Sequence, residues 1–189
     1  IKREIGDVRG ESASLNNLGN AYNSLGQYQT AIDFHQQSLK ITREIGDVRG
    51  ESYSLNNLGN AYDSLGQYQT AIDFYQQSLK ITREIGDVGG ESYSLNNLGA
   101  AYDSLGQYQT AIDFHQQSLK ITREIGDVRG ESNSLIGLGY AYNSLGQYQT
   151  AIDFYQQSLK IKREIGDVGG EANAWFNLGL VLEKVDREA

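Results

Sequence analysis

The residues best suited to metal binding or acid–base chemistry in this 189-residue chain are its only two histidines, His35 and His115. They occupy the same position in two copies of a forty-residue repeat. At ~10 Å per layer of packed helices they would lie roughly 20 Å apart, too far to share one metal ion. In the alternate copies this position is Tyr75 or Tyr155, so we expect both histidines to pack in the interior.

Other catalytic constellations are missing from the sequence as well. The run Gly86-Asp87-Val88-Gly89-Gly90 has neither the Lys-Ser/Thr ending nor the preceding strand of a phosphate-binding loop. The carboxylates of Glu84 and Asp87 are more simply helix-end and capping charges. Without cysteine there is no thiolate metal site, cysteine nucleophile or disulfide. We therefore predict a protein that is not an enzyme and uses no cofactor or metal.

Charge and hydropathy exclude further classes of partner. The net charge is −8, and no repeat carries the basic excess that neutralises phosphates, so we expect no binding to nucleic acid or to anionic membranes. The apolar stretches are too short to span a bilayer, and no signal peptide is visible. The default expectation is a cytoplasmic protein. Because the chain starts inside a repeat without Met, we expect it to be a fragment.

The chain is dominated by its repetition. Four full units cover residues 11–50, 51–90, 91–130 and 131–170, with partial units at 1–10 and 171–189. A period this regular is typical of a solenoid, in which each unit packs only on its neighbours. We therefore predict a single array over residues 1–189, whose function lies on a surface rather than in an enclosed site.

Each unit has the pattern of two antiparallel helices. In residues 51–90, Leu55, Leu58 and Tyr62 recur at helical spacing, Gly66 interrupts the pattern, and a second apolar arc runs from Tyr68 to about residue 85. A glycine followed by aspartate ends each second helix, and the aspartate can cap the next helix, which would begin near residue 48, 88, 128 or 168. Nine main helices and a short N-terminal helical tail are expected.

The repeated sequence segments resemble those of a known family. The segments Asn57-Leu58-Gly59-Asn60-Ala61-Tyr62 and Leu65-Gly66-Gln67-Tyr68 are similar to the tetratricopeptide repeat (TPR) consensus, and the resemblance runs the length of the chain. The unit has 40 residues rather than the usual ~34. Ser78 and Arg83 stand where the family commonly has alanine and a closing proline. Long units of this kind resemble Pins/LGN-like adaptors and bacterial TPR arrays.

The resemblance implies an all-α fold, a TPR-type helical-hairpin solenoid that winds as a right-handed superhelix. It also implies a protein–protein interaction scaffold that binds a peptide or protein segment in a concave groove lined by the first helix of each unit.

Comparison of the four copies indicates where a ligand would bind. Only eight of forty columns vary, and five of them lie on the first helix. At 100° per residue these five fall within about 120°, opposite the core stripe. Exposed faces can drift neutrally, but the exposed polar columns of the second helix, such as that of Gln69, are unchanged in all copies. The pattern therefore favours a functional groove over drift.

The residue types on this face suit peptide recognition. Tyrosines are stiff, large anchors, and asparagine amides can both donate to and accept from a peptide backbone. In the family, Asn17, Asn57, Asn97 and Asn177 match positions that commonly grip the ligand backbone. The candidate ligand-binding residues are Asn16, Asn17, Asn20, Tyr53, Asn56, Asn57, Asn60, Asp63, Tyr93, Asn96, Asn97, Asp103 and Tyr140.

The charges on the same face bear on the kind of ligand. The face has no Lys or Arg that could clamp a C-terminal carboxylate, whereas Asp63 and Asp103 lie in its middle. We therefore expect a neutral or basic ligand.

Two alternatives remain open. The tail Ile1–Ile5 and the last first helix, with Trp175, Leu178 and Leu182, resemble the two halves of a repeat interface, so chains could associate weakly head to tail as a structural spacer. Alternatively, the array could be the sensor segment of a larger signalling or protease protein.

Overall fold

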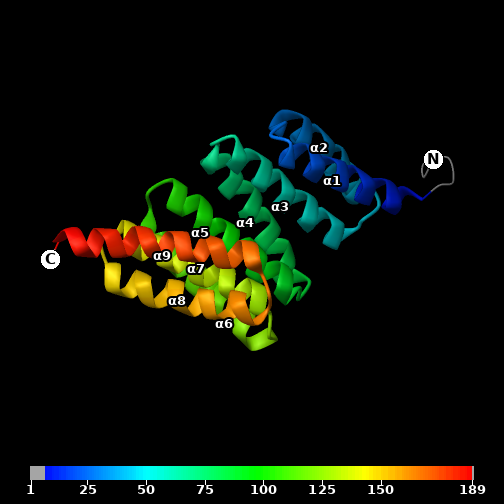
Figure 1. Ribbon diagram of the computed structural model, residues 1–189. Helices are drawn as coiled ribbons and strands as arrows, with labels where there is room; N and C mark the ends of the chain where they lie inside the picture. Colours follow the sequence, from blue (N-terminus) through cyan, green and yellow to red (C-terminus); the bar gives the residue numbers. More distant parts are fainter. Residues whose placement is uncertain (1–6, 189) are drawn as a thin grey trace. The chain divides into compact units, whose positions relative to one another are not determined.

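The computed structural model describes residues 7–188, and in this range the chain forms nine α-helices and no strand (Figure 1). The all-α helical-hairpin fold expected from the sequence is confirmed, while the predicted N-terminal tail lies outside the described residues. The helices are α1 (Val8–Ser24), α2 (Tyr28–Glu44), α3 (Val48–Ser64), α4 (Tyr68–Glu84), α5 (Val88–Ser104), α6 (Tyr108–Ile125), α7 (Val128–Ser144), α8 (Tyr148–Glu164) and α9 (Val168–Glu188).

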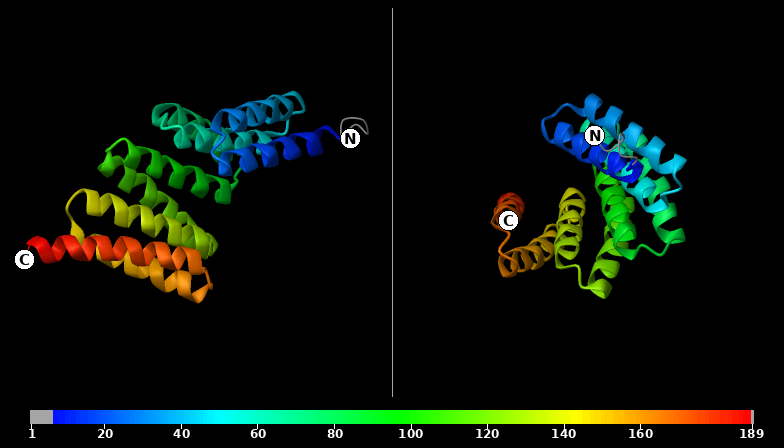
Figure 2. Two further views of the ribbon diagram at one scale, coloured as in Figure 1. Left: turned by 45° about the horizontal axis from the view of Figure 1, so that its top comes forward. Right: turned by 90° about the vertical axis from the view of Figure 1, so that its right-hand side faces the viewer.

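The chain divides into two compact units, Ile1–Asn97 and Leu98–Ala189, with the division inside α5. In the first unit α1 packs on α2, α2 on α3, and α3 on α4; in the second, α6 packs on α7, α7 on α8, and α8 on α9. Figure 2 shows consecutive helices within each unit running in opposite directions. Within each unit, consecutive helices therefore pack as antiparallel hairpins.

Glycine and aspartate set the helix ends, as the sequence predicts. The turn glycines, for example Gly66 and Gly86, have φ of 75° and 67°, a left-handed conformation that residues with a Cβ rarely adopt. The next aspartate then caps the following helix: the Oδ1 atom of Asp47 or Asp87 accepts the N–H of the glycine three residues later, at 3.1 Å. These caps fix where the first helix of each repeat begins.

The core of each unit is built from the predicted apolar stripes. In the first unit Ile32 on α2 packs with Leu55 and Leu58 on α3, all at most 1% exposed. Tyr62 stacks on Phe74 with ring centroids 5.3 Å apart, near the turn that connects α3 and α4. In the second unit Ala111, Ile112, Leu119, Leu135, Leu138 and Ala141 form the equivalent cluster.

In the four complete repeats, a glycine of the first helix lies directly against a buried ring of the second helix. Gly19 contacts the ring of His35, and Gly59 contacts that of Tyr75. A Cβ atom on either glycine would overlap the ring. Gly179, at the same repeat position in α9, has no such neighbour within 4 Å.

Buried serines join neighbouring repeats within the first unit. Ser78, fully buried on α4, donates to the Ser52 carbonyl at 3.0 Å, and its Oγ lies 3.2 Å from the Oγ of Ser94 on the next first helix. Asn56 also donates to both hydroxyls. The serine that replaces the family's alanine therefore belongs to a polar contact that spans three helices and leaves its hydroxyl satisfied.

The histidines occupy the interior, as predicted. His35 is 1% exposed, and its Nδ1 lies 3.0 Å from the Oδ1 of Asn16. Burial lowers the pKa of His35 to about 4, so the ring is neutral near pH 7. His115 is 2% exposed, with Nε2 3.1 Å from the Oδ2 of Asp103.

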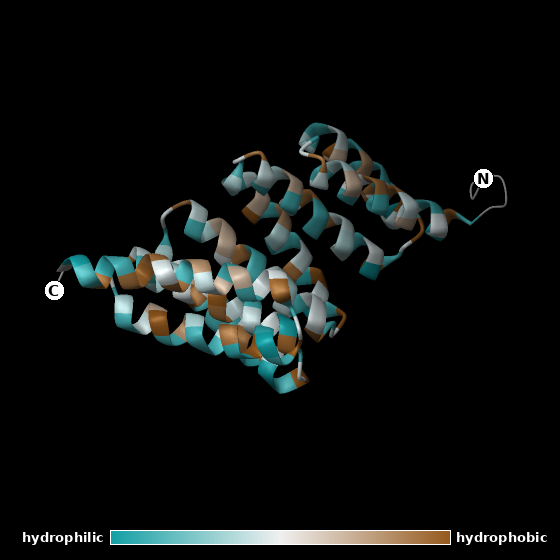
Figure 3. Cartoon of the chain, in the orientation of Figure 1, coloured by the Kyte–Doolittle hydropathy of each residue, from teal (hydrophilic) through white to brown (hydrophobic). Residues whose placement is uncertain are grey.

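No helix among the described residues is both long and apolar enough to cross a membrane. Figure 3 shows why, because hydrophilic and hydrophobic residues alternate along every helix.

The glycine–ring contact predicts opposite effects for one substitution at two equivalent positions. Gly59→Ala should lower the free energy of unfolding by about 1–3 kcal/mol, because the new methyl group overlaps the Tyr75 ring. Gly179→Ala should leave it unchanged or raise it by up to ~1 kcal/mol, since alanine favours a helix and nothing blocks it. Urea unfolding followed by circular dichroism measures both, and equal effects would contradict the steric explanation.

The depressed pKa of His35 predicts a pH-dependent stability. Between the unfolded value of ~6.5 and the folded value of about 4, the unfolded chain binds a proton that the folded protein excludes, so stability falls as the pH is lowered through this window.

The matched control is His35→Tyr, because Tyr75 fills the equivalent position and hydrogen-bonds Asn60, whose counterpart Asn20 is available. Relative to this variant, wild type should lose roughly 1–3 kcal/mol between pH 7 and pH 4. Parallel stability curves for the two proteins would show that His35 is not responsible.

Candidate functional site

A cavity of about 410 Å³ opens on the first helices of the first unit. Its walls come from α1, α3 and the start of α5, together with residues at the α2–α3 junction. Six of the thirteen candidate ligand-binding residues line it together: Asn16, Asn17, Asn20, Tyr53, Asn57 and Tyr93. The face on which the repeats differ therefore coincides, in this unit, with a hollow of the surface.

Two tyrosines stand at this cavity with their rings accessible. Tyr53 is 54% exposed and Tyr93 is 48% exposed, although both are large and partly apolar. Tyr93 is held in place by Asn60, whose Nδ2 donates to its hydroxyl at 3.2 Å. The Oδ1 of Asn60 in turn accepts from the Tyr75 hydroxyl at 2.8 Å and from the Asn97 amide at 3.3 Å. Asn60 and Asn97 thus orient an aromatic side chain beside the cavity.

The asparagines of this face fall into two groups. The side chains of Asn17, Asn20 and Asn57 make no hydrogen bond to any described residue, so their amides are free to pair with a ligand. Asn16 is half-buried and already engaged, because its Oδ1 lies against His35 and its Nδ2 donates to Ser54.

Asn56 and Asp103 depart from the expectation of one exposed face. Asn56 is only 3% exposed, because α3 turns this position toward the buried serines of the neighbouring repeat. Asp103, in the second unit, is 7% exposed and pairs with His115. Placing these two side chains on an open surface was wrong.

The two acidic residues, Asp63 and Asp103, differ in exposure, since Asp63 is half-buried and Asp103 is buried. Burial raises the pKa of Asp63, and one of its carboxylate oxygens is buried without a hydrogen-bond partner. Burial also raises the pKa of Asp103, and the hydrogen bond from His115 opposes that rise. The pKa of the Tyr75 hydroxyl is raised, first by burial and then by the nearby Asp63 and Tyr93.

The remaining candidates lie away from this cavity. Asn96 is half-buried at the end of the first unit. Tyr140, on α7 of the second unit, is 47% exposed.

Sequence reasoning missed a cation at the edge of the cavity. Arg9, in the first turn of α1, lines the cavity with its Nε 3.2 Å from the Oδ2 of Asp47. A basic residue thus reaches the cavity from outside the clamp positions, and Asp47 offsets its charge. The signal was available, because the corresponding column alternates between arginine and glycine, as at Arg49 and Gly89.

A metal centre is not found among the described residues. No group of three or more His, Cys, Asp or Glu side chains in residues 7–188 is placed to hold a metal ion. What the geometry offers is an open hollow with exposed rings, free amides and one balanced ion pair, which suits non-covalent recognition.

Comparison with solved structures shows the same fold. Aspartyl phosphate phosphatase F from Bacillus subtilis has a TM-score of 0.84 at 18% identity over 95% of this chain, which spans 47% of that protein. A kinesin light chain protein of nearly identical TPR-like repeats from Podosopora anserina has a TM-score of 0.75 at 22% identity, covering 93% of this chain and 86% of that one.

A third similar structure is the signal transduction ATPase with a tetratricopeptide repeat sensor from Pyrococcus horikoshii. Its TM-score is 0.77 at 20% identity, with 90% of this chain and 26% of that chain covered. No curated protein matches the sequence.

The family itself is shown by the sequence. The tetratricopeptide repeat model matches residues 10–84, 90–164 and 131–189. These ranges cover all of the chain except residues 1–9 and 85–89. The chain therefore belongs to the tetratricopeptide repeat family.

Proposed function

We propose that this protein is an interaction scaffold that binds a peptide or protein segment in the cavity lined by α1, α3 and the start of α5. Membership of the tetratricopeptide repeat family supports a protein-interaction scaffold in general. The observation that carries the more specific proposal is the overlap of two independent features: the columns in which the repeats differ, and the walls of the 410 Å³ cavity.

The available groups suit an extended backbone. Asn17, Asn20 and Asn57 each offer one acceptor and two donor hydrogens, and none of these groups bonds to a described residue. Tyr53 and Tyr93 add rigid, exposed apolar area in the same cavity. Such a surface grips main chain through the amides and selects side chains through the rings.

The charge of the face favours a neutral or basic segment. Arg9 is offset by Asp47, so among the described lining residues no unpaired cation attracts a carboxylate. The half-buried Asp63 adds acidic character on the same helix as Tyr53. We infer binding without catalysis, with no cofactor.

The test is a matched pair of tyrosine variants. A peptide array first identifies a binding sequence, and calorimetry then compares wild type with Tyr93→Ala and Tyr140→Ala. Tyr93→Ala should weaken binding by about 1–3 kcal/mol and leave the melting temperature nearly unchanged, because the ring is an exposed anchor.

Tyr140 is equally exposed but outside this cavity, so its removal should change little. Equal losses at the two sites would place the ligand elsewhere. A large fall in stability of Tyr93→Ala would instead mark that residue as structural.

A second function, weak self-association, is favoured by apolar side chains on α9. Trp175, Phe176 and Leu182 are 48%, 66% and 44% exposed. Leu178, expected on the same open stripe, is instead 4% exposed because it packs in the core with Ala151 and Ile152 on α8. The patch is thus smaller than predicted, and its proposed partner, residues 1–5, lies outside the described range.

This proposal makes a prediction about solution mass. Wild type should show a concentration-dependent rise in sedimentation coefficient that Leu182→Glu reduces, since a charge on an apolar contact is costly. If both proteins sediment as monomers across the series, head-to-tail stacking is excluded.

A further inference from the structure

A second cavity in the first unit lies between the starts of α3 and α5, beside Thr82 of α4. Its volume is about 230 Å³, and we call it the Asp87 pocket. The lining residues used below are Tyr53, Asn56, Thr82, Asp87, Gly90 and Tyr93. Two exposed aromatic side chains therefore share a pocket with a carboxylate.

The polar atoms of this pocket are mostly acceptors. Asp87 keeps 17% of its side chain exposed, and only its Oδ1 is used to cap α5 at Gly90. The Oδ2 of Asp87 lies 3.6 Å from the Nε of Arg49, a loose contact of an arginine that is itself 66% exposed. Asn56, 3% exposed, has an Oδ1 that accepts no hydrogen bond. A ligand with several donor hydrogens would complement these groups.

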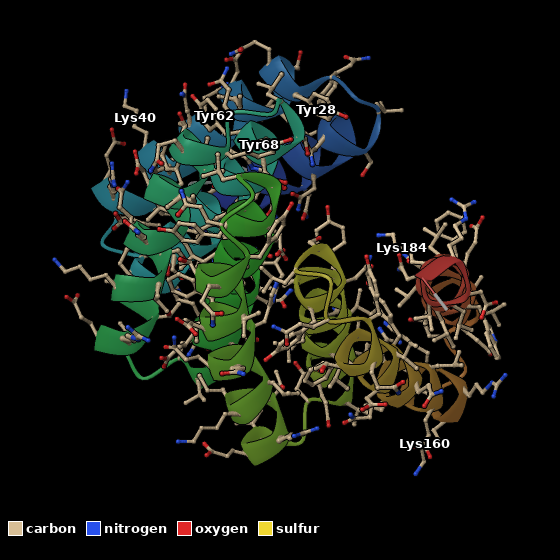
Figure 4. The ribbon with its side chains drawn as sticks, turned by 90° about the vertical axis from the view of Figure 1, so that its left-hand side faces the viewer. Tyr28, Lys40, Tyr62, Tyr68, Lys160 and Lys184 are labelled. Carbon is tan, nitrogen blue, oxygen red and sulfur yellow. The ribbon has the colours of Figure 1, made fainter. Side chains whose placement is uncertain are left out.

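The fourth repeat has a charged side chain at the position equivalent to Thr82 in the Asp87 pocket. There Lys162 stands where the other repeats have threonine, and its side chain is only 7% exposed. Its Nζ donates to the Oδ2 of Asp167 at 2.9 Å and to the Oδ1 of Asn133 at 3.3 Å. By contrast Lys160, one of the labelled residues, points outward from the same helix α8 (Figure 4). An ammonium group is thus held beside the capping aspartate within the protein itself.

The two places are geometrically equivalent. A Cβ on Gly90 would lie 2.8 Å from the Cγ2 of Thr82 and 3.0 Å from the Oδ2 of Asp87. A Cβ on Gly170 would likewise meet the stem of Lys162, at 2.6 Å from its Cδ, and the carboxylate of Asp167. The side chain of Thr82 therefore points toward its capping aspartate as that of Lys162 does. Because threonine is shorter, it leaves open the space that the lysine fills in the fourth repeat.

The neighbouring Arg49 does not prevent an ammonium group from binding in the Asp87 pocket. Asp167 accepts Lys162 while Arg129, the repeat equivalent of Arg49, lies close enough to help lower the pKa of that carboxyl, after the larger contributions of the Gly170 N–H and Lys162. One carboxylate thus serves an ammonium and a nearby guanidinium together.

We infer that the Asp87 pocket is a subsite for a primary ammonium, the lysine side chain of the segment bound in the groove. This inference rests on the proposed function and specifies a side chain of its ligand. The ammonium donates to Asp87, as Lys162 donates to Asp167, and the aliphatic stem lies beside Tyr53 and Tyr93, whose rings also attract a cation. A compact ammonium on a flexible stem reaches such a recess more readily than a planar guanidinium.

The experiment uses two acetylated, amidated pentapeptides, four alanines around a central lysine or around norleucine, which has a similar stem without the charge. Each is titrated into isotope-labelled protein, and the amide signals of Gly89 and Gly90 are followed by NMR. The lysine peptide should shift both signals saturably. The norleucine peptide should have an affinity at least about tenfold lower, since it lacks the charged hydrogen bond.

Variants that fill and open the pocket give the sharper test. Thr82→Lys should occupy the Asp87 pocket with the protein's own ammonium and abolish the shifts, whereas the matched Thr122→Lys variant should preserve them. Reciprocally, Lys162→Thr should create new shifts at Gly169 and Gly170. If Thr82→Lys does not fold, Asp87→Asn decides, because asparagine keeps the helix cap but removes the charge.

Equal affinity for the two peptides, or an undiminished response in folded Thr82→Lys or Asp87→Asn, would overturn the ammonium subsite. If the array-selected peptide still depends on Tyr93 in that case, the proposed function stands and this inference alone fails. If that peptide is indifferent to Tyr93, the proposed function fails.

Discussion

The spacing of the helices depends on one contact, that of a first-helix glycine against a buried ring of the second helix. At Gly59 the Tyr75 ring occupies the volume in which any other residue would carry its Cβ. A glycine inside a helix costs up to ~1 kcal/mol relative to alanine, so this position is maintained against local propensity. The gain is a close approach of α3 and α4, which brings the Tyr75 hydroxyl through to Asn60 on the ligand-facing side. Core packing and the surface of the groove are therefore physically connected.

The identity of that ring then determines which polar residue it supports. Tyrosine is long enough for Tyr75 to reach Asn60, and through it Tyr93. Histidine is shorter, so His35 pairs with Asn16, one turn nearer the helix start, and leaves the amide of Asn20 open to the cavity. Alternation of histidine and tyrosine thus changes the hydrogen-bonding groups presented along the face without altering the backbone framework.

Periodicity predicted the helices, their caps and the buried stripes, because these depend on contacts that recur in every copy. Asp87 caps α5 and Leu58 is fully buried, as their spacing indicates. The site was harder to predict, because a helical wheel gives the direction of a side chain and not what the next helix covers. Asn56 shares the variable face with Tyr53, yet it faces buried serines. Gly137 replaces asparagine where the His115 ring lies, so packing explains that variation without a ligand.

Variation among near-identical repeats therefore has two physical origins that sequence alone does not separate. Some changes alter contacts inside the core, such as the one between Asp103 and His115. Others alter what an accessible recess contains: Lys162 fills the space that Thr82 leaves open, beside an aspartate that caps a helix in both repeats. A capping aspartate stabilises the start of the next helix at Asp47, Asp87, Asp127 and Asp167, so a carboxylate is available at each of these junctions regardless of function. Whether it becomes part of a binding site is then decided by the single neighbouring side chain that covers or exposes it.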